Sequence, residues 1–228
     1  MGEALRAAAI RSQGVVLRDY ADGREILRMD LPAEPGFYLM HRADLVGVLS
    51  RAVREANVTV RLSHETEAVD INDDGTPSVR LADGRILTQD LVVGADGLHS
   101  PTRKAVERSG QPFFTGQVAW RMVLAEKTEI PPEAAVYMGP GRHLVTYPLR
   151  DGKARNIVAV EERDSWTAEG WHHTDDSARV RRAFSAFCPE VRGWLDSARE
   201  VNVWGLFRHP VAEQWYRGRV ALLGDAAH

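Results

Sequence analysis

Runs of alternating apolar and polar residues on either side of Asp-Gly pairs predict several β-hairpins. Asp-Gly supplies the positive φ angles that a tight turn needs, so strand-like runs flanking such a pair are expected to pair antiparallel. The predicted hairpins join residues 15–19 to 25–29, 78–82 to 85–93, and 144–149 to 155–161. The chain is therefore expected to be rich in strands, many of them antiparallel.

Apolar residues at helical spacing predict fewer helices. The first is expected over residues 44–56, with a buried stripe made of Leu45, Leu49 and Val53. The second is expected to start after Asp175 or Asp176 as N-cap, and Pro189 ends it and can open a short third helix. The stripe of the second helix consists of Val180, Ala183, Phe184 and Phe187.

Two apolar runs, each predicted to be a buried strand, end in turns that contain glycine and aspartate. Residues 91–93 lead into Asp96-Gly97, after which Ser100-Pro101 predicts a capped helix start, and residues 220–223 lead into Gly224-Asp225. A strand, a glycine turn and a helix N-terminus can present backbone N–H groups to a phosphate, and an aspartate after a strand can bind ribose hydroxyls. The plainer alternatives are a capped βα turn at Asp96 and an N-cap carboxylate at Asp225.

Composition and charge narrow the class of protein. The 228 residues carry a net charge of −3 and are 44% hydrophobic, which is ordinary for a soluble protein and gives no case for nucleic acid or an anionic membrane. No apolar run approaches the ~20 residues of a membrane span, and the N-terminus does not read as a secretory signal. Cys188 is the only cysteine, so a thiolate metal cluster is excluded and no metal site is expected. We expect a cytoplasmic protein.

The order of the predicted elements indicates a mixed α/β (α+β) fold in two interleaved parts. Residues 41–110 and 210–228 combine helices with buried strands, whereas residues 111–209 form a mostly antiparallel sheet with an amphipathic helix. Residues 1–40 are ambiguous and contain a helix and a hairpin.

Several spaced motifs resemble those of flavin-dependent aromatic hydroxylases with the para-hydroxybenzoate hydroxylase fold, close to the salicylate hydroxylase and 3-hydroxybenzoate 6-hydroxylase branch. Asp96-Gly97 matches the Asp-Gly motif of that family, and Gly224-Asp225 matches its second FAD fingerprint, here followed by Ala-Ala-His. Further matches are His41-Arg42-Ala43-Asp44-Leu45, Ala119-Trp120-Arg121, Tyr147-Pro148-Leu149-Arg150 and Trp204-Gly205-Leu206.

The resemblance implies a division of labour between the segments. Residues 41–110 and 210–228 would form a partial, Rossmann-like FAD-binding domain, residues 111–209 a substrate-binding sheet domain, and residues 1–40 a part near the substrate side. The last FAD-binding segment reads as truncated, since no helix follows Asp225.

The resemblance also implies roles for single residues. Asp225 would bind ribityl or ribose hydroxyls of FAD, and Gly224 would permit close approach. Asp96 and Gly97 would lie near the pyrophosphate, in a motif that the family also links to NAD(P)H. Arg42 would contact the flavin side of the cofactor; its alternative is a solvated arginine that opens a helix.

His143 is the candidate catalytic residue. It alternates with Val145 and Tyr147, so the three side chains are expected to share one face of a strand. A histidine there could deprotonate a phenol and so activate the ring for attack on an electrophilic oxygen. A hydrogen-bonded histidine at a sheet edge is the alternative. Arg121 is a lesser candidate that could reach the cofactor or pair with an acid.

The implied reaction is hydroxylation of a small phenolic or aromatic acid. NADH or NADPH would reduce FAD, and reduced flavin and O₂ would give a C4a-hydroperoxide that transfers OH to the ring. A homodimeric parent is compatible with the resemblance. The competing interpretations are an FAD oxidoreductase of the same fold, such as an epoxidase or a reductase, and a non-enzymatic binding fragment.

The sequence contains no Gly-x-Gly-x-x-Gly motif for the ADP half of FAD, with which the family normally begins. We therefore expect these residues to be an internal fragment of a hydroxylase, inactive alone and with reduced FAD affinity.

Overall fold

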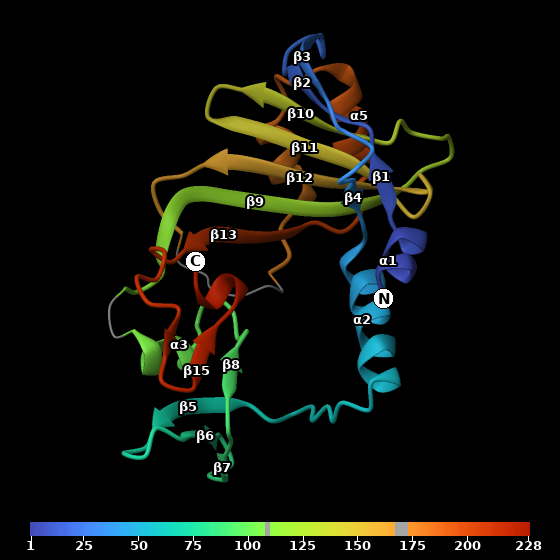
Figure 1. Ribbon diagram of the computed structural model, residues 1–228. Helices are drawn as coiled ribbons and strands as arrows, with labels where there is room; N and C mark the ends of the chain where they lie inside the picture. The colour runs from blue at the N-terminus through green and yellow to red at the C-terminus, as the bar shows by residue number, and fades with distance from the viewer. Residues whose placement is uncertain (108–109, 167–172) are drawn as a thin grey trace. The chain divides into compact units, whose positions relative to one another are not determined.

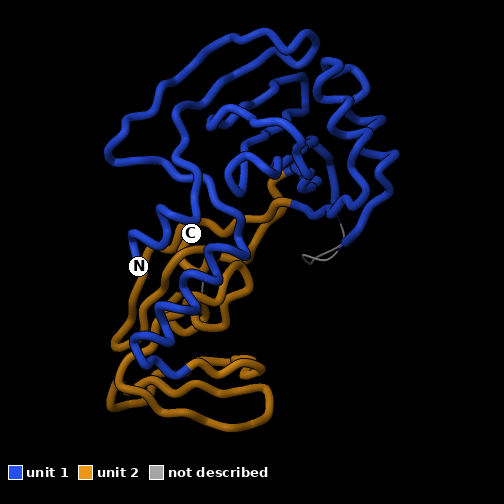
Figure 2. The backbone as a smooth tube through the Cα atoms, turned by 90° about the vertical axis from the view of Figure 1, so that its right-hand side faces the viewer, with its two compact units in different colours: residues 1–59, 116–205 blue, residues 60–115, 206–228 orange. Residues whose placement is uncertain are grey.

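The computed structural model describes residues 1–107, 110–166 and 173–228. The chain forms two compact units, each built from two stretches of sequence (Figure 2). Unit 1 comprises residues 1–59 and 116–205, and unit 2 comprises residues 60–115 and 206–228. The cofactor and substrate roles given above to the sequence segments remain predictions.

Unit 1 is built around a seven-stranded sheet (Figure 1). In spatial order its strands are β13 (Asn202–Arg208), β9 (Phe113–Ala125), β12 (Ala154–Glu162), β11 (Arg142–Leu149), β10 (Glu133–Gly139), β2 (Gly14–Asp19) and β3 (Glu25–Asp30). From β9 to β3 the neighbours are antiparallel, except that β10 and β2 run parallel. The predicted hairpins β2–β3 and β11–β12 are confirmed.

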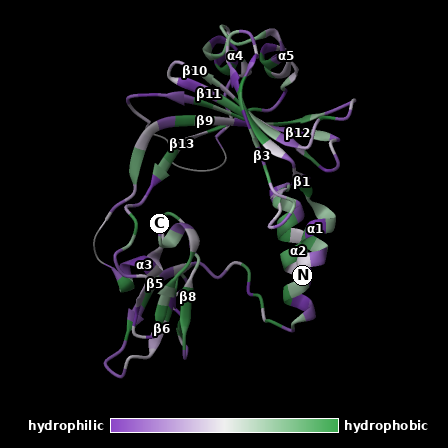
Figure 3. Cartoon of the chain, turned by 45° about the horizontal axis from the view of Figure 1, so that its top comes forward, coloured by the Kyte–Doolittle hydropathy of each residue, from purple (hydrophilic) through white to green (hydrophobic). Residues whose placement is uncertain are grey.

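One face of this sheet is covered by α4 (Ser177–Ala183) and α5 (Pro189–Ser197), as Figure 3 shows. Asp176 caps α4 by accepting a hydrogen bond from the Ala178 N–H, and Pro189 opens α5, both as predicted. Apolar side chains that are almost fully buried fill the space between sheet and helices, namely Trp120, Leu144, Ile157, Val180, Phe184, Val191 and Leu195. This layer is the main core of unit 1.

The opposite, open face of the sheet is defined by strand register. Directly paired residues of antiparallel strands share a face, so Arg121 of β9, Val158 of β12 and Val145 of β11 lie in one row. The neighbouring rows on this face are Val123, Asn156 and Tyr147 on one side, and Ala119, Val160 and His143 on the other. His143, Val145 and Tyr147 therefore share a face, as predicted.

Unit 1 also contains α1 (Gly2–Ala8), α2 (Arg42–Glu55) and a two-stranded sheet of β1 (Ile10–Ser12) and β4 (Phe37–Leu39). The predicted helix at α2 is confirmed, but its predicted buried stripe is wrong. Leu45 is 37% exposed and Leu49 is 40% exposed, whereas Val48 is 3% exposed. The buried residue therefore lies on a different face of the helix from the one that sequence periodicity favours.

Unit 2 contains two three-stranded sheets and a short helix. One sheet consists of β5 (Thr66–Ile71), β6 (Pro77–Leu81) and β7 (Ile86–Thr88), and the other of β14 (Tyr216–Arg217), β15 (Val220–Leu222) and β8 (Val92–Gly94). Helix α3 (Pro101–Val106) and the 3₁₀ turn η1 (Gly224–Ala226) follow β8 and β15. Their core is formed by Val69, Val106, Ala212, Val220, Leu222, Ala226 and Ala227.

Two expectations for unit 2 are corrected. The hairpin predicted to join residues 78–82 to 85–93 exists as β6–β7 but ends at Thr88. Residues 92–94 belong to a different sheet, in which β8 pairs parallel with β15. The run 91–93 is also not buried, since Leu91 is 62% and Val93 54% exposed. The reason is topological: β8 is an edge strand with a single neighbour, β15. Leu223 is likewise exposed, although Val220 and Leu222 are buried.

No helix among the described residues is both long and apolar enough to cross a membrane.

Candidate functional site

The two aspartate–glycine turns of unit 2 lie at the same edge of a sheet. Strands β8 and β15 are parallel neighbours, with Gly94 opposite Leu222, and the Leu223 N–H donates to the Gly94 carbonyl at 2.8 Å. Parallel neighbours have their carboxyl ends at one edge, where α/β folds bind ligands. The turns with Asp96-Gly97 and Gly224-Asp225 are therefore brought together, although they are about 130 residues apart in sequence.

The Asp96 carboxylate is fully engaged in holding the start of α3. Its Oδ1 accepts from the Ser100 hydroxyl at 2.5 Å, and its Oδ2 accepts from the Thr102 N–H at 3.0 Å and the Thr102 hydroxyl at 2.7 Å. The Ser100 hydroxyl in turn accepts from the Arg103 N–H at 2.8 Å, which confirms the predicted cap. Because side chains take these first-turn amides, this helix start does not offer them to a phosphate. Asp96 fixes the shape of the turn.

Glycine is required at three positions of this edge for two different reasons. Gly97 has φ +77° and Gly224 has φ +61°, and an added Cβ at either would meet nothing within 4 Å. Their backbone is thus left-handed, which favours glycine, and open to close approach by a ligand. At Gly94, by contrast, a Cβ would stand 2.5 Å from Thr102 Cβ, so this glycine lets α3 pack against β8.

Asp225 is the exposed carboxylate at this edge. It lies in η1, directly after Gly224, and makes no hydrogen bond or ion pair with any described residue. A carboxylate that is free beside an open glycine backbone is suited to accept hydrogen bonds from ligand hydroxyl groups.

Arg103 is a contributor to this edge that the sequence did not reveal. It is 3% exposed, and its Nη1 donates to the Ala226 and Ala227 carbonyls at 3.2 and 3.3 Å. Its Nη2 donates to the Pro210 carbonyl at 2.8 Å and pairs with Glu107 at 3.3 Å. The guanidinium thereby fastens the Gly224-Asp225 turn to α3. In sequence it reads as an ordinary surface arginine, because burial of its head group depends on residues over 100 positions away.

Unit 1 carries a separate, cationic cavity beside the open face of its sheet. The cavity has a volume of about 980 Å³, and its polar lining includes Arg42, Arg121, Asn156, Arg199 and Trp204. Arg121 is stacked over the Trp204 ring, with its guanidinium carbon 4.6 Å from the ring centroid. Burial lowers the pKa of Arg121, and the charge of Arg42 lowers it further. The structure therefore brings Arg42 together with Arg121, the lesser candidate of the sequence.

Arg121 is exposed to the cavity and makes no hydrogen bond to any described residue. A guanidinium has five N–H donors, so those of Arg121 are open to a ligand. A bound anion would supply both the acceptors and the opposite charge.

His143 lies on the same open face but does not line this cavity. It is flanked on its face by Met138 of β10 and Val160 of β12. Burial lowers the pKa of His143 below its usual 6.5, and Glu162 opposes this shift only in part. The imidazole is thus neutral at pH 7 and able to accept a proton. Tyr147, two rows along on the same face, interacts electrostatically with Arg121.

The lowered pKa of His143 predicts a pH dependence of stability. The folded protein binds a proton at His143 less readily than the unfolded chain does. His143 therefore favours the folded state above about pH 6.5, and this contribution is lost as the pH falls from 6.5 toward the lowered folded value. We expect the urea midpoint to drop more between pH 7.5 and 5.5 in the unchanged chain than in His143→Gln. An equal drop in both proteins would show that His143 is not the responsible group.

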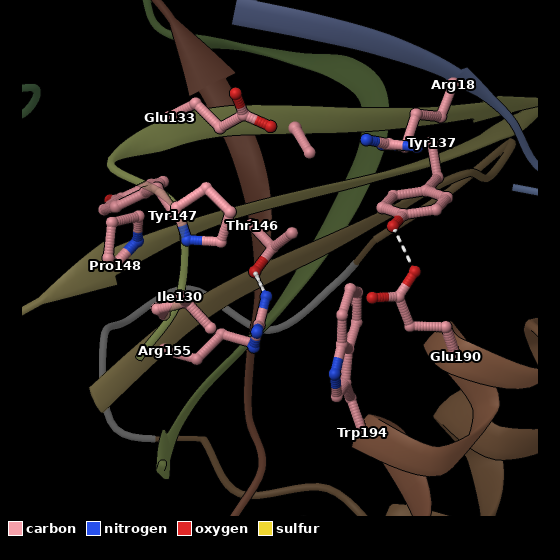
Figure 4. Close-up of a pocket in the computed structure, with 12 residues that line it drawn as sticks. Arg18, Ile130, Glu133, Tyr137, Thr146, Tyr147, Pro148, Arg155, Glu190 and Trp194 are labelled. Atoms are coloured by element: carbon pink, nitrogen blue, oxygen red, sulfur yellow. Dashed lines mark hydrogen bonds between the residues drawn. The ribbon is translucent and has the colours of Figure 1, made fainter. Parts of the chain in front are cut away.

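A second cavity, of about 220 Å³, lies between the helix-covered face of the sheet and α5 (Figure 4). Its charged groups are already paired: the Tyr137 hydroxyl donates to Glu190 at 2.7 Å, and Glu133 pairs with Arg28 at 2.7 Å. Arg155 pairs with Glu126 and stacks on Trp194. The Tyr137–Glu190 and Arg155–Trp194 contacts join α5 to the sheet, so we assign this cavity a structural role.

Comparison with known proteins agrees with this arrangement. The family model described as FAD binding domain matches residues 6–228. The 3-amino-4-hydroxybenzoate 2-monooxygenase of Streptomyces cremeus is 31% identical over 243 aligned residues, covering 99% of this chain and 58% of the relative. The 3-hydroxybenzoate 6-hydroxylase of Polaromonas naphthalenivorans is 30% identical, covering 100% of this chain and 59% of the relative.

A solved structure titled "Salicylate hydroxylase substrate complex" has the same fold, with a TM-score of 0.83 at 22% identity, covering 100% of this chain and 61% of that one. The mixed α/β chain with its large antiparallel sheet thus has the fold of the FAD-dependent hydroxylases. The chain belongs to the FAD binding domain family, and its relatives are named as FAD-dependent monooxygenases and aromatic hydroxylases. The predicted fold class and family resemblance are thus confirmed. The chain spans somewhat less than three fifths of the length of the two curated relatives.

Proposed function

We propose that the chain serves an FAD-dependent monooxygenase that uses NADH or NADPH and O₂ to hydroxylate a small phenolic or aromatic acid. The observation that carries the substrate class is the cavity of unit 1, where Arg121 and the nearby Arg42 present two positive charges and an aromatic wall at Trp204. Such a lining suits a flat ring with a carboxylate. The names of the relatives support the same class of reaction.

The residues at the sheet edge of unit 2 fit a flavin cofactor. Gly97 and Gly224 offer open backbone in the left-handed conformation, and Asp225 offers a free carboxylate for the sugar-like hydroxyls. We propose that Asp225 holds ribityl or ribose hydroxyls, that Gly224 and Gly97 permit close approach, and that Asp96 shapes the turn beside the pyrophosphate. When bound, FAD supplies the redox chemistry, taking reducing equivalents from NAD(P)H and activating O₂ for transfer of one oxygen atom.

The side chains of unit 1 would then act on the substrate. We propose that Arg121 binds its carboxylate, and that Arg42 contributes charge on the flavin side of the same cavity. His143, which shares the open face with Arg121, is neutral at pH 7 and would accept the phenolic proton. The apolar members of the open face, including Val145 and Val158, would limit access of water to the ring.

Salicylate provides a direct test of the anion site, because its own fluorescence reports binding. We expect Arg121→Gln to weaken salicylate binding by about tenfold or more, since it removes a charge-assisted contact with the carboxylate. Arg54→Gln, at the exposed end of α2, is the matched control and should bind like the unchanged chain. Equal affinity of Arg121→Gln and the unchanged chain would exclude Arg121 as the carboxylate site.

The competing interpretations are separated by product analysis of a flavin-loaded parent protein. Substrate-dependent O₂ uptake that yields a hydroxylated aromatic acid supports the proposal. An epoxide product, or substrate reduction without O₂ uptake, would favour another oxidoreductase of the same fold.

A further inference from the structure

Arg42 lies in the first turn of α2, in an electrostatically unfavourable position. Arg42 is the first residue of the helix, where the helix dipole is positive. Its charge also acts on Arg121, with which it lines the cavity, and lowers the pKa of that residue. Both effects disfavour Arg42 at the cavity, so an interaction that fixes the first turn of α2 would help to keep Arg42 there.

That interaction is a two-point ion pair between Asp44 and Arg150. The Arg150 Nε donates to Asp44 Oδ2 at 2.9 Å, and its Nη2 donates to Asp44 Oδ1 at 3.1 Å. Paired N–H groups on both carboxylate oxygens fix orientation as well as distance. The pair joins the first turn of α2 to the end of β11, across 106 residues of sequence.

The backbone conformation at position 150 is unfavourable for arginine, whereas the arginine side chain makes the contact with Asp44. Arg150 has φ +51°, Asp151 has φ +56° and Gly152 has φ +77°, three successive left-handed residues in the β11–β12 turn. Residues with a Cβ are disfavoured there, and an arginine more than an aspartate. A glycine at position 150 would relieve the backbone but could not reach Asp44.

We propose that Arg150 is a positioning residue, whose two-point contact with Asp44 fixes the first turn of α2 and keeps Arg42 at the cavity it shares with Arg121. The proposal rests on the proposed function for the use of that cavity. The Arg150 side chain is 54% exposed and that of Asp44 is 32% exposed. Exposed ion pairs add little to global stability, so the effect is expected to be local.

Arg150→Gly separates the local effect on the first turn of α2 from global stability, because it removes the guanidinium and relieves the backbone at the same time. We expect its urea midpoint to be unchanged or higher, while the amides of residues 43–45, which bond to His41, exchange about threefold to fivefold faster with solvent. Asp44→Asn, which lacks the charge, should raise the exchange in the same direction. The matched control is Asp151→Gly, which relieves the neighbouring φ and leaves the ion pair intact. Exchange in Arg150→Gly equal to that of the unchanged chain would overturn the proposal.

A second readout asks whether Arg150 acts through Arg42. Arg150→Gly should weaken salicylate binding no more than Arg42→Gln does, and the double variant should bind as weakly as Arg42→Gln alone. Losses that multiply in the double variant would contradict a role through Arg42. If salicylate does not bind the unchanged chain at all, the proposed function fails, and the exchange rates still decide the role of Arg150.

Discussion

Trp120→Ala is expected to lower the free energy of unfolding of unit 1 by about 3–5 kcal/mol, the range for removing a large aromatic side chain from a core. Trp120 is fully buried on the helix-covered face of β9 and packs edge-on against Phe184, with ring centroids 6.3 Å apart. Its indole N–H donates to Asp175 Oδ2 at 2.8 Å. The truncation would leave both a cavity and an acceptor without its donor.

The same substitution should also affect the candidate site. Trp120 directly precedes Arg121, and the two side chains point to opposite faces of β9. The indole therefore anchors the stretch of strand that presents Arg121 to the cavity. Urea unfolding followed by circular dichroism measures the loss of stability. Trp120→Phe is the control: it keeps most of the packing and loses the N–H, so a smaller loss of about 1–2 kcal/mol is expected. Similar stability of Trp120→Ala and the unchanged chain would contradict the described core.

Asp225→Ala is expected to weaken flavin binding by about tenfold to a hundredfold, the larger of the predicted effects on ligands. Losing one hydrogen bond between a ligand hydroxyl and a charged group costs about 1.5–3 kcal/mol, which corresponds to about tenfold to a hundredfold in affinity. Asp225 is exposed and unpaired among the described residues, so its removal should not disturb the fold. Asp225→Asn, which keeps one acceptor oxygen, should lie in between. Glu213→Ala, an exposed carboxylate elsewhere in unit 2, is the matched control.

Local features of the fold could be predicted from sequence because their causes are local. The Asp-Gly turns give the β2–β3 and β11–β12 hairpins, and Asp176, Ser100 and Pro189 mark helix starts. Each depends on backbone preferences within a few residues. The alternation that places His143 and Tyr147 on one face is local as well.

Contacts between segments that lie far apart in sequence could not be predicted, and the wrong predictions of burial follow from this. The run 91–93 has the apolar character of a buried strand, yet β8 lies at an edge and pairs with β15 far along the chain. Likewise, the periodicity of α2 favours Leu45 and Leu49 as buried residues, whereas the folded chain buries Val48 instead. An apolar pattern shows that a face can be buried but does not specify the partner that covers it.

The candidate site shows the same limit. The glycines and Asp225 are visible in sequence because their motifs are short and contiguous. The motifs predict Arg42 and Arg121 as separate candidates, but the cavity that they share and the burial of Arg103 depend on contacts between distant segments, which local sequence does not specify.

We propose that the turn at Gly224-Asp225 binds the sugar-like part of a flavin. Titration of the purified chain with FAD and FMN, followed by quenching of flavin fluorescence and repeated with excess ADP, tests it most directly. Because the sequence has no Gly-x-Gly-x-x-Gly motif to bind the ADP half, we expect weak, saturable binding of one flavin per chain. We also expect comparable affinities for FAD and FMN, no displacement by ADP, and flavin affinity that is lower by about tenfold or more in Asp225→Ala. Displacement of FAD by ADP, unchanged flavin affinity in Asp225→Ala, or no saturable flavin binding by the folded chain would contradict it.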